Sequence, residues 1–267
     1  SPSRGLGDVY KSQGIGAAPR RHGGTVDGCT RVNRAARLSF GVIGAGRVGP
    51  VIAAALVGAD HRLVGITHGS DDDRVDALLP GVRFAEAEQI AAEAELIVLA
   101  VPHDQLAGLV AGLAAVGAWR PGQLVMHVDP GHGLDVLAPA AAAGAVGFAV
   151  HPAIAFTGSS MDLRQLTSAY AGVSAPGPFL PIALALAVEL GCEPVVIGED
   201  ERAAYAEAVA TASTFSREIV RQSVELLRDA GVENPGRFLS SLVRTSVDRA
   251  LAEASTDPLD SFDPLAP

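Results

Sequence analysis

The sequence of 267 residues has few lysines, aromatic residues and cysteines, and each shortage excludes a class of protein. Lys11 is the only lysine beside nineteen arginines, which excludes lysine acid catalysis and Schiff-base chemistry from the rest of the chain. Aromatic residues make up 4% of the sequence, so the core must be aliphatic. Cys29 and Cys192 lie far apart without paired spacing, which argues against a disulfide framework and a cysteine-based zinc site.

Long hydrophobic runs and excess positive charge are missing as well. No apolar run reaches the ~18 residues of a membrane-spanning helix, because polar or charged residues interrupt each one. The net charge is −10 with the acids spread along the chain, which disfavours nucleic acid and anionic membranes as partners. We therefore expect a soluble, cytoplasmic protein that acts on a small-molecule substrate.

Residues 1–37 differ in composition from the remainder of the chain. They are rich in Gly, Ser and Arg and have no hydrophobic period, which predicts a disordered leader. The stretch "GLGDVYKSQ" resembles a translated sequencing adapter, so we interpret the leader as non-native and exclude it from the fold. A signal peptide is disfavoured, because no apolar stretch of about 7 to 15 residues precedes the first predicted strand.

Apolar runs of strand length alternate with Ala- and Leu-rich helical stretches from residue 38 onward. This alternation is typical of a parallel sheet covered by helices on both faces, so residues 38–198 predict a doubly wound, Rossmann-like α/β domain. Strands are predicted within 38–44, 61–67, 95–102, 122–128, 146–152, 168–175 and 192–198, and helices within 48–57, 85–94, 104–116 and 134–143.

Residues 199–267 predict a smaller, all-helical C-terminal domain. One helix is expected within 199–231, with acids at its start and Gly231 at its end, and a second over 235–253. Two helices are few for a domain. We therefore expect either that the C-terminus is truncated or that these helices dock on another subunit.

A glycine-rich turn lies between the first predicted strand and the first predicted helix. In "FGVIGAGRVGPVIAAAL", Gly44, Gly46 and Gly49 have the GxGxxG spacing of a dinucleotide site. Gly44 would permit the tight turn, Gly46 the approach of a pyrophosphate, and Gly49 the close packing of helix on strand. The helix start, with Arg47 and Val48, would bind the phosphates. A purely structural turn, or a site for another phosphate ligand such as a nucleotide-sugar, is the alternative.

The ends of the second and third strands should complete the cofactor site. Thr67, with Arg47 or Arg74 nearby, would accept the 2′-phosphate of NADP, so we favour NADP and keep NAD as the alternative. Asp71–Asp73 come late for a contact to the ribose of NAD and fit a solvated helix start. His103 could equally face water. The residues expected to border the nicotinamide are Val101, Pro102 and His103.

Histidines follow the next two predicted strands at the same edge of the sheet: His127 and His132, then His151. A hydride-transfer enzyme needs a proton donor beside its substrate, and histidine titrates near neutrality. We predict His151 and His132 as catalytic, with His127, Thr157 and Ser159 binding the substrate. The alternatives are a core role for His127, a helix cap for His132 and support of the turn for His151. No metal is expected, because the histidines lack helical ligand spacing.

Four motifs together resemble a known family: "GVIGAGRVG", "VLAVPHDQL", the run from His127 to Leu137, and "HPAIAFTG". The family consists of bacterial, chiefly actinobacterial, proteins that join a Rossmann-like NAD(P)-binding domain to a second domain of unknown function. The resemblance covers about Leu38 to Ala250. Its wider relatives are pyrroline-5-carboxylate reductase, prephenate dehydrogenase, 6-phosphogluconate dehydrogenase-like enzymes and ketopantoate reductases. It implies a hydride-transfer enzyme that forms a homodimer through its C-terminal helices.

The chain departs from this family at several positions. Relatives have small polar residues where this chain has Val128–Pro130, and an arginine where it has Gly69. In the helix after residue 198 they carry His and Asn, which Thr211, Ser213 and Thr214 would partly replace, the last two at the substrate. The leading hypothesis is an NADP-dependent oxidoreductase that reduces a small keto or imino acid. The departures keep open a second one, a cofactor-binding sensor or scaffold without turnover.

Overall fold

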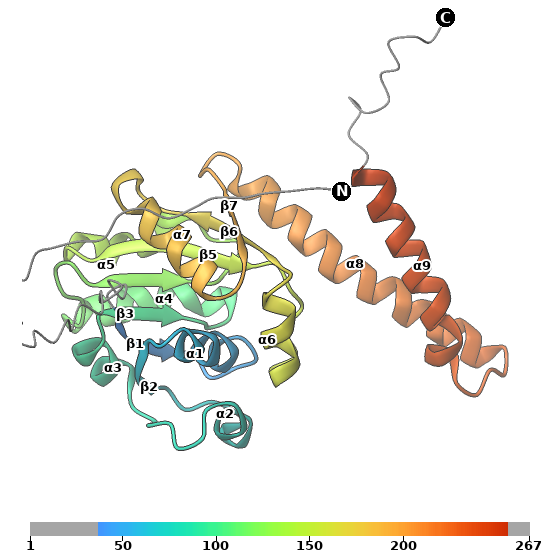
Figure 1. Cartoon of the computed structure of the whole chain (residues 1–267), viewed down its shortest axis with the longest axis horizontal. Helices are drawn as coiled ribbons and strands as arrows, with labels where there is room; N and C mark the ends of the chain where they lie inside the picture. Colours follow the sequence, from blue (N-terminus) through green and yellow to red (C-terminus); the bar gives the residue numbers. More distant parts are fainter. Residues whose placement is uncertain (1–36, 256–267) are drawn as a thin grey trace, which may run out of the picture. The chain divides into compact units, whose positions relative to one another are not determined.

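The structure, a computed structural model, describes residues 37–255. The predicted leader lies outside the described residues apart from Arg37, as does the predicted C-terminal tail beyond residue 255. Seven strands form one sheet in the order β2-β1-β3-β4-β5-β6-β7 (Figure 1). Their bounds are β1 (Ser39–Ile43), β2 (Arg62–Ile66), β3 (Leu96–Leu99), β4 (Leu124–His127), β5 (Val146–Pro152), β6 (Tyr170–Ser174) and β7 (Glu193–Val196).

The first five strands run parallel, whereas β6 runs antiparallel to β5 and carries β7 parallel to itself. The expectation of a parallel sheet is therefore wrong for its last two strands. The chain does not return to the opposite edge of the sheet after β5: it forms α6 (Ser160–Leu166), which contacts α1. The chain re-enters at that same edge, where Pro152 pairs with Ala171.

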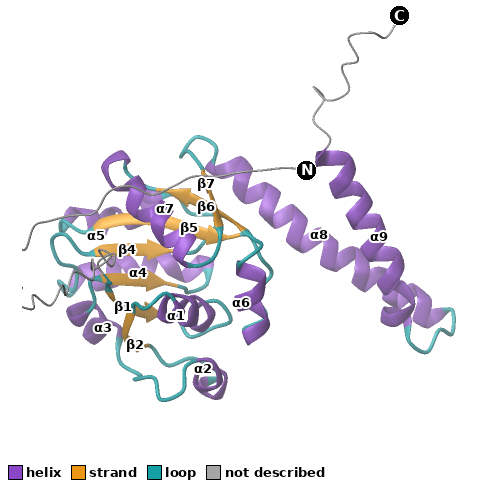
Figure 2. Cartoon of the chain, viewed as in Figure 1, coloured by secondary structure: helices purple, strands orange, loops and turns teal. Residues whose placement is uncertain are grey.

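Helices cover both faces of the sheet, as the near-continuous apolar strands require (Figure 2). On one face α1 and α7 pack on Phe40, Val42 and Phe148. On the other α3, α4 and α5 pack on Ile97 and Leu99. The doubly wound, Rossmann-like fold class is thereby confirmed. The bounds are α1 (Gly49–Gly58), α2 (Asp72–Leu78), α3 (Ala87–Glu93), α4 (His103–Ala115), α5 (Ala138–Ala142) and α7 (Leu180–Glu189).

The chain ends its described part in two helices, α8 (Arg202–Asp229) and α9 (Pro235–Ser255), which pack on each other. The first turn of α8 differs from the rest of the helix, because Arg202 is buried there. Farther along, both helices expose large apolar side chains. None of the helices in the described range is long and apolar enough to cross a membrane. The exposed residues of this pair include Phe215, Ile219, Leu226, Phe238, Leu242 and Val247.

Candidate functional site

The three glycines of the turn between β1 and α1 are needed for different reasons. Gly44 has a φ of +116°, and a Cβ there would lie 2.3 Å from the Ala100 carbonyl oxygen. A Cβ at Gly49 would lie 1.9 Å from the carbonyl oxygen of Gly44, so this position must stay bare for α1 to pack on β1. A Cβ at Gly46 would meet nothing within 4 Å. Gly46 therefore borders open space in which a ligand can approach the backbone.

The start of α1 fits the pyrophosphate of a dinucleotide. No side chain caps its first turn, so the amides there are available to an anion. Arg47 is exposed beside this turn, and Val48 precedes the first helical residue. Gly46, Arg47 and Val48 would thus hold the phosphates, in the open space that Gly46 borders.

Thr67 supports the glycine-rich turn from the end of β2. Its Oγ1 accepts a hydrogen bond of 2.9 Å from the Gly44 amide, so the structure already uses this hydroxyl. Arg74 forms an ion pair with Asp71, which lowers the pKa of that exposed carboxyl through their hydrogen bonds. Asp71 also caps α2 by accepting from the Arg74 amide at 3.0 Å. This agrees with the interpretation of Asp71–Asp73 as a helix start.

One pocket of about 260 Å³ brings predicted cofactor and catalytic residues together. It lies at the carboxyl edge of the parallel strands, where ligands bind in open α/β sheets. Val48 borders it from the start of α1 and His151 from the end of β5. The predicted nicotinamide-binding residues Val101, Pro102 and His103 line it from the turn between β3 and α4. Further lining comes from Ala100, Val128, Asp129, Pro130 and Phe156.

Asp129 gathers two imidazoles beside this pocket. Its Oδ1 is 3.0 Å from Nδ1 of His103 and 3.0 Å from Nδ1 of His132, whose rings lie 4.1 Å apart. Burial would raise the pKa of Asp129, but hydrogen bonds from both histidines and from the His132 amide hold it below its ordinary value. The ligand atoms of the three residues lie within 4.8 Å of one another, a spacing that could hold a metal ion and that the hydrogen bonds also explain.

His127 and His151 are neutral, because burial lowers the pKa of each from 6.5 to about 4. The nearby charge of Arg202 adds to this effect. Nδ1 of His151 lies 2.7 Å from the hydroxyl of Tyr205 in the first turns of α8. The ring of Tyr205 approaches because Gly172, the register partner of His151, has no side chain. The expectation that His151 titrates near neutrality is therefore wrong.

Sequence reasoning missed Arg202 and Tyr205. Both come from α8, and the guanidinium carbon of Arg202 lies 5.7 Å from the centre of the Tyr205 ring. Arg202 is 5% exposed and donates to the hydroxyl of Ser174 on β6. No local signal distinguishes these residues, because an arginine and a tyrosine after three acidic positions are typical of a solvated helix start.

The loop after β5 is placed differently from the expectation of direct substrate contact. Thr157 Oγ1 donates to the buried Asp162 at 2.7 Å, and the amides of Thr157 and Gly158 donate to the same carboxylate. Ser159 caps α6 through the Met161 amide. A Cβ at Gly158 would lie 3.2 Å from Cα of Arg47, so this loop packs on the glycine-rich turn. Substrate binding by Thr157 and Ser159 stays a prediction.

Ser213 and Thr214 are both exposed on α8. Ser213 donates to the Ala210 carbonyl in its own helix at 3.3 Å. Neither residue lines the pocket that His151 shares with Val101 and Pro102. The structure thus does not bring these two predicted substrate residues to the histidines, and their role too stays a prediction.

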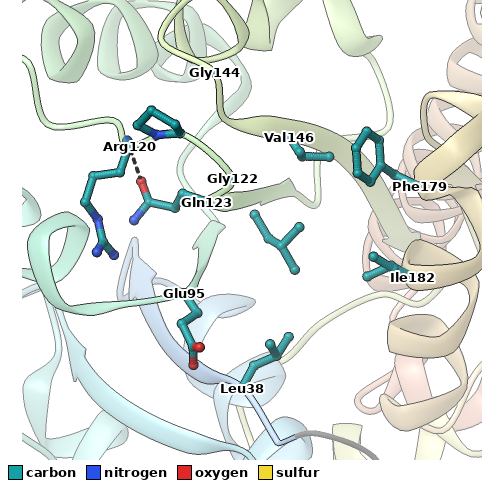
Figure 3. Close-up of a pocket in the computed structure, with 11 residues that line it drawn as sticks. Leu38, Glu95, Arg120, Gly122, Gln123, Gly144, Val146, Phe179 and Ile182 are labelled. Carbon is teal, nitrogen blue, oxygen red and sulfur yellow. Dashed lines mark hydrogen bonds between the residues drawn. The ribbon is translucent and has the colours of Figure 1, made fainter.

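A second pocket, of about 570 Å³, lies at the opposite edge of the sheet, where β4 and β5 begin (Figure 3). Its polar groups are already engaged. Glu95 accepts from the amide and hydroxyl of Ser39, and Gln123 donates to the carbonyls of Ala91 and Ala94. The opposite side, drawn in Figure 3, consists of the apolar side chains of Leu38, Val146, Phe179 and Ile182. This cavity has no convergent reactive groups, so size does not identify the site.

Solved structures share this fold at low sequence identity. A Bacteroides fragilis protein named for an expected NADP oxidoreductase activity has a TM-score of 0.67 and 16% identity, over 85% of this chain and 84% of that one. An imine reductase of Streptomyces aurantiacus has a TM-score of 0.61 and 17% identity, over 84% of this chain and 79% of that one. Pyrroline carboxylate reductase of Plasmodium falciparum, with NADP bound, has a TM-score of 0.59 and 11% identity, over 83% of this chain and 80% of that one. No curated protein matches the chain in sequence.

The fold and the glycine-rich turn thus define a Rossmann-like protein whose candidate site lies at the carboxyl edge of its sheet. The family models agree: the Rossmann-like domain matches residues 25–152, and a domain of unknown function (DUF2520) matches residues 169–259. The chain thus contains a match to each of these two domain models, one after the other. The DUF2520 match includes β6, β7 and the helices α8 and α9, so it spans Arg202 and Tyr205.

Proposed function

We propose that the protein is an NADP-dependent oxidoreductase that transfers hydride to a small keto or imino acid. One observation carries the proposal: a single pocket joins the residue at the start of α1, the predicted nicotinamide-binding residues and His151. When bound on the glycine-rich turn, the dinucleotide supplies the hydride. Structural neighbours with reductase names support the same chemistry.

The end of β2 favours NADP over NAD. An NAD site commonly has an acid at this point to bind the ribose hydroxyls. Here Thr67 ends the strand segment, and Arg47 is exposed beside the turn without an ion pair to any described residue. An arginine in this position would bind the extra phosphate of NADP.

His151 orients the substrate as a neutral hydrogen-bond donor. The Tyr205 hydroxyl lies 2.7 Å from Nδ1 of His151. In this proposal the hydroxyl is the donor, which places the imidazole proton on Nε2. That Nε2–H would donate to the carbonyl oxygen or imine nitrogen of the substrate as its carbon is reduced. His132, held by Asp129 with His103, lies next to the same pocket and would exchange protons with solvent.

The decisive experiment is an assay of NADPH oxidation with a panel of keto acids and cyclic or linear imino acids. We expect turnover of at least one member and weaker activity with NADH. Binding of NADPH without turnover of any member would favour the sensor or scaffold. No binding of either dinucleotide would contradict both hypotheses.

The quaternary structure is a second part of the proposal: a homodimer that buries the exposed apolar residues of α8 and α9. Ile219 and Leu242 are 61% and 60% exposed and line one groove between these helices. Exposed apolar surface of this kind marks interaction sites. Ile219→Glu should dissociate the dimer, whereas Val188→Glu, at a similarly exposed position on α7, should not. Analytical ultracentrifugation measures the difference. A monomeric wild-type protein would contradict the proposal. The cytoplasmic location stays a prediction of the sequence.

A further inference from the structure

Arg202 is a buried cation without a carboxylate partner. It is 5% exposed, and no Asp or Glu of the described residues forms an ion pair with it. Its Nε and one terminal nitrogen, Nη1, have no hydrogen-bond partner there. Buried charges are normally paired, because an unpaired charge loses its hydration without compensation. The side chain therefore has binding capacity that the described part of the protein does not use.

A second buried group adds another unused donor. Nδ1 of His127 accepts a hydrogen bond of 3.3 Å from the Asp129 amide, so the proton of the neutral ring is on Nε2. That Nε2 is fully buried and forms no hydrogen bond of regular geometry with the described residues, although a weak one to the Gly133 backbone raises the pKa of His127. The positive charge of Arg202 lowers the pKa of His127 and also that of His151. Unused donors and a positive charge thus occur together beside the candidate active site.

The acids near Arg202 are held elsewhere. A pocket of about 330 Å³ is lined by Arg202, His132, Asp135 and Glu199, among others. Glu199 Oε2 accepts from the Leu134 amide at 3.0 Å and lies 2.3 Å from where a Cβ of Gly133 would be. The bare glycine thus lets this carboxylate sit on the backbone instead of on the guanidinium. Both acids are exposed, whereas Arg202 is buried.

We propose that Arg202, assisted by Nε2 of His127, binds the carboxylate of the substrate. A guanidinium recognises a carboxylate through parallel N–H donors, in the pairs Nε with Nη2 or Nη1 with Nη2. The second hydrogen of Nη2, which also donates to Ser174, completes either pair with the free Nε or Nη1. Ser174 positions the group, since its hydroxyl accepts from Nη2 of Arg202 and donates to the Ile197 carbonyl. The ligand class is a small carboxylate. Only the statement that this carboxylate belongs to the substrate rests on the proposed oxidoreductase activity.

The test uses pyruvate as the probe and acetone, the same ketone without a carboxylate, as its control. Thermal unfolding of the full chain is followed with no dinucleotide present, so the result is independent of cofactor binding. Pyruvate at about 10 mM should raise the Tm of the wild-type protein, because a ligand of the folded state stabilises it. Acetone should not. Absence of a pyruvate effect on the wild-type protein would overturn the proposal.

Arg202→Met keeps the length of the side chain and removes its charge. We expect pyruvate to lose its effect on this variant, while Tm without ligand is no lower than that of the wild-type protein, because no unpaired charge remains buried. The matched control is Arg221→Met on the same helix, where the arginine is exposed and paired with Glu218 and Glu225. This control should respond to pyruvate as the wild-type protein does. An equal response of Arg202→Met would overturn the proposal.

Two further variants keep the test decisive if Arg202→Met does not fold. Arg202→Lys retains the charge but not the fork, so pyruvate affinity should fall by about tenfold. Glu199→Gln retains an oxygen for the Leu134 amide and removes a competing carboxylate, so pyruvate affinity should rise. A loss of Tm in Glu199→Gln without a gain in affinity would show that Glu199 neutralises Arg202, and would also overturn the proposal.

Discussion

The two sides of the candidate site are built in different ways. On the side of the glycine-rich turn, backbone conformation makes the site: a positive φ at Gly44, bare Cα positions and an uncapped helix start. On the side of α8, side chains make it, and Arg202 and His127 are buried with unused hydrogen-bonding atoms. The backbone side suits a constant ligand such as a dinucleotide. The side-chain side is where the choice of substrate would be made.

The backbone side can be broken at Gly49. Gly49→Ala places a Cβ 1.9 Å from the Gly44 carbonyl oxygen, so α1 must shift away from β1. We expect the free energy of unfolding to fall by about 3 kcal/mol, measured by urea denaturation. Gly58→Ala in the same helix meets nothing within 4 Å and should be neutral or slightly stabilising. Equal stabilities of the two variants would refute the packing role of Gly49.

On the side of α8, the buried histidines should make the free energy of unfolding depend on pH. The pKa of His127 and of His151 is about 4 in the folded protein, against 6.5 for an ordinary histidine. Between pH 6.5 and about pH 4 the two histidines are protonated in the unfolded state but not in the folded state. Their contribution to the free energy of unfolding is therefore complete above pH 6.5 and is lost as the pH falls toward 4. When the pH is lowered from about 7 to about 5, each histidine should reduce the free energy of unfolding by about 2 kcal/mol.

The variant His127→Leu isolates one of these two contributions. Its free energy of unfolding should fall over the same pH interval by about 2 kcal/mol less than that of the wild-type protein. Denaturant titrations at the two pH values measure the difference. If the variant and the wild-type protein lose stability equally, His127 is not held neutral by burial.

The contact between α8 and β5 can be tested by activity. Tyr205→Phe removes only the hydroxyl that fixes the tautomer of His151, so kcat should fall by about tenfold, and His151→Ala should lower it by about 100-fold. NADPH affinity should stay unchanged in both. Tyr170→Phe on β6, whose ring is exposed, is the matched control. An equal loss of NADPH affinity and kcat would place His151 on the cofactor side instead.

The smallest effect is expected at the cluster of His103, Asp129 and His132. Hydrogen bonds to Asp129 hold both rings, so we expect that the cluster needs no metal ion. Dialysis against EDTA should change neither Tm nor NADPH-dependent turnover. A fall in Tm that zinc restores would show that the three residues bind a metal.

Sequence patterns predict the two sides of the site unequally. All seven strands are predicted, because the sheet is buried on both faces and its aliphatic runs are nearly continuous. The helices α6 and α7 are not predicted, and of α2 only the start at Asp71–Asp73 is. The reversal at β6 is not predicted either, because the connection between β5 and β6 is about as long as those that join the parallel strands. The glycines are found because their spacing reflects local backbone geometry.

Arg202 and Tyr205 could not be found in the same way. Tyr205 meets His151 across 54 residues of sequence, and Arg202 meets Ser174 across 28. Their burial depends on where the first turn of α8 lies over β5 and β6, which no local pattern encodes. The order of strands and helices predicts that the histidines lie at the strand ends. Their low pKa values are not predicted, because they depend on burial beneath the first turns of α8.

The central claim is that the glycine-rich turn binds a nicotinamide dinucleotide. Calorimetric titration of the wild-type protein and of Gly46→Val with NADPH and NADH tests it most directly, since a Cβ at Gly46 would meet nothing within 4 Å. We predict that the wild-type protein binds NADPH more tightly than NADH. Gly46→Val should keep the wild-type Tm and bind NADPH at least about tenfold more weakly. Equal NADPH affinity in the two proteins, or no binding to either, would contradict the account.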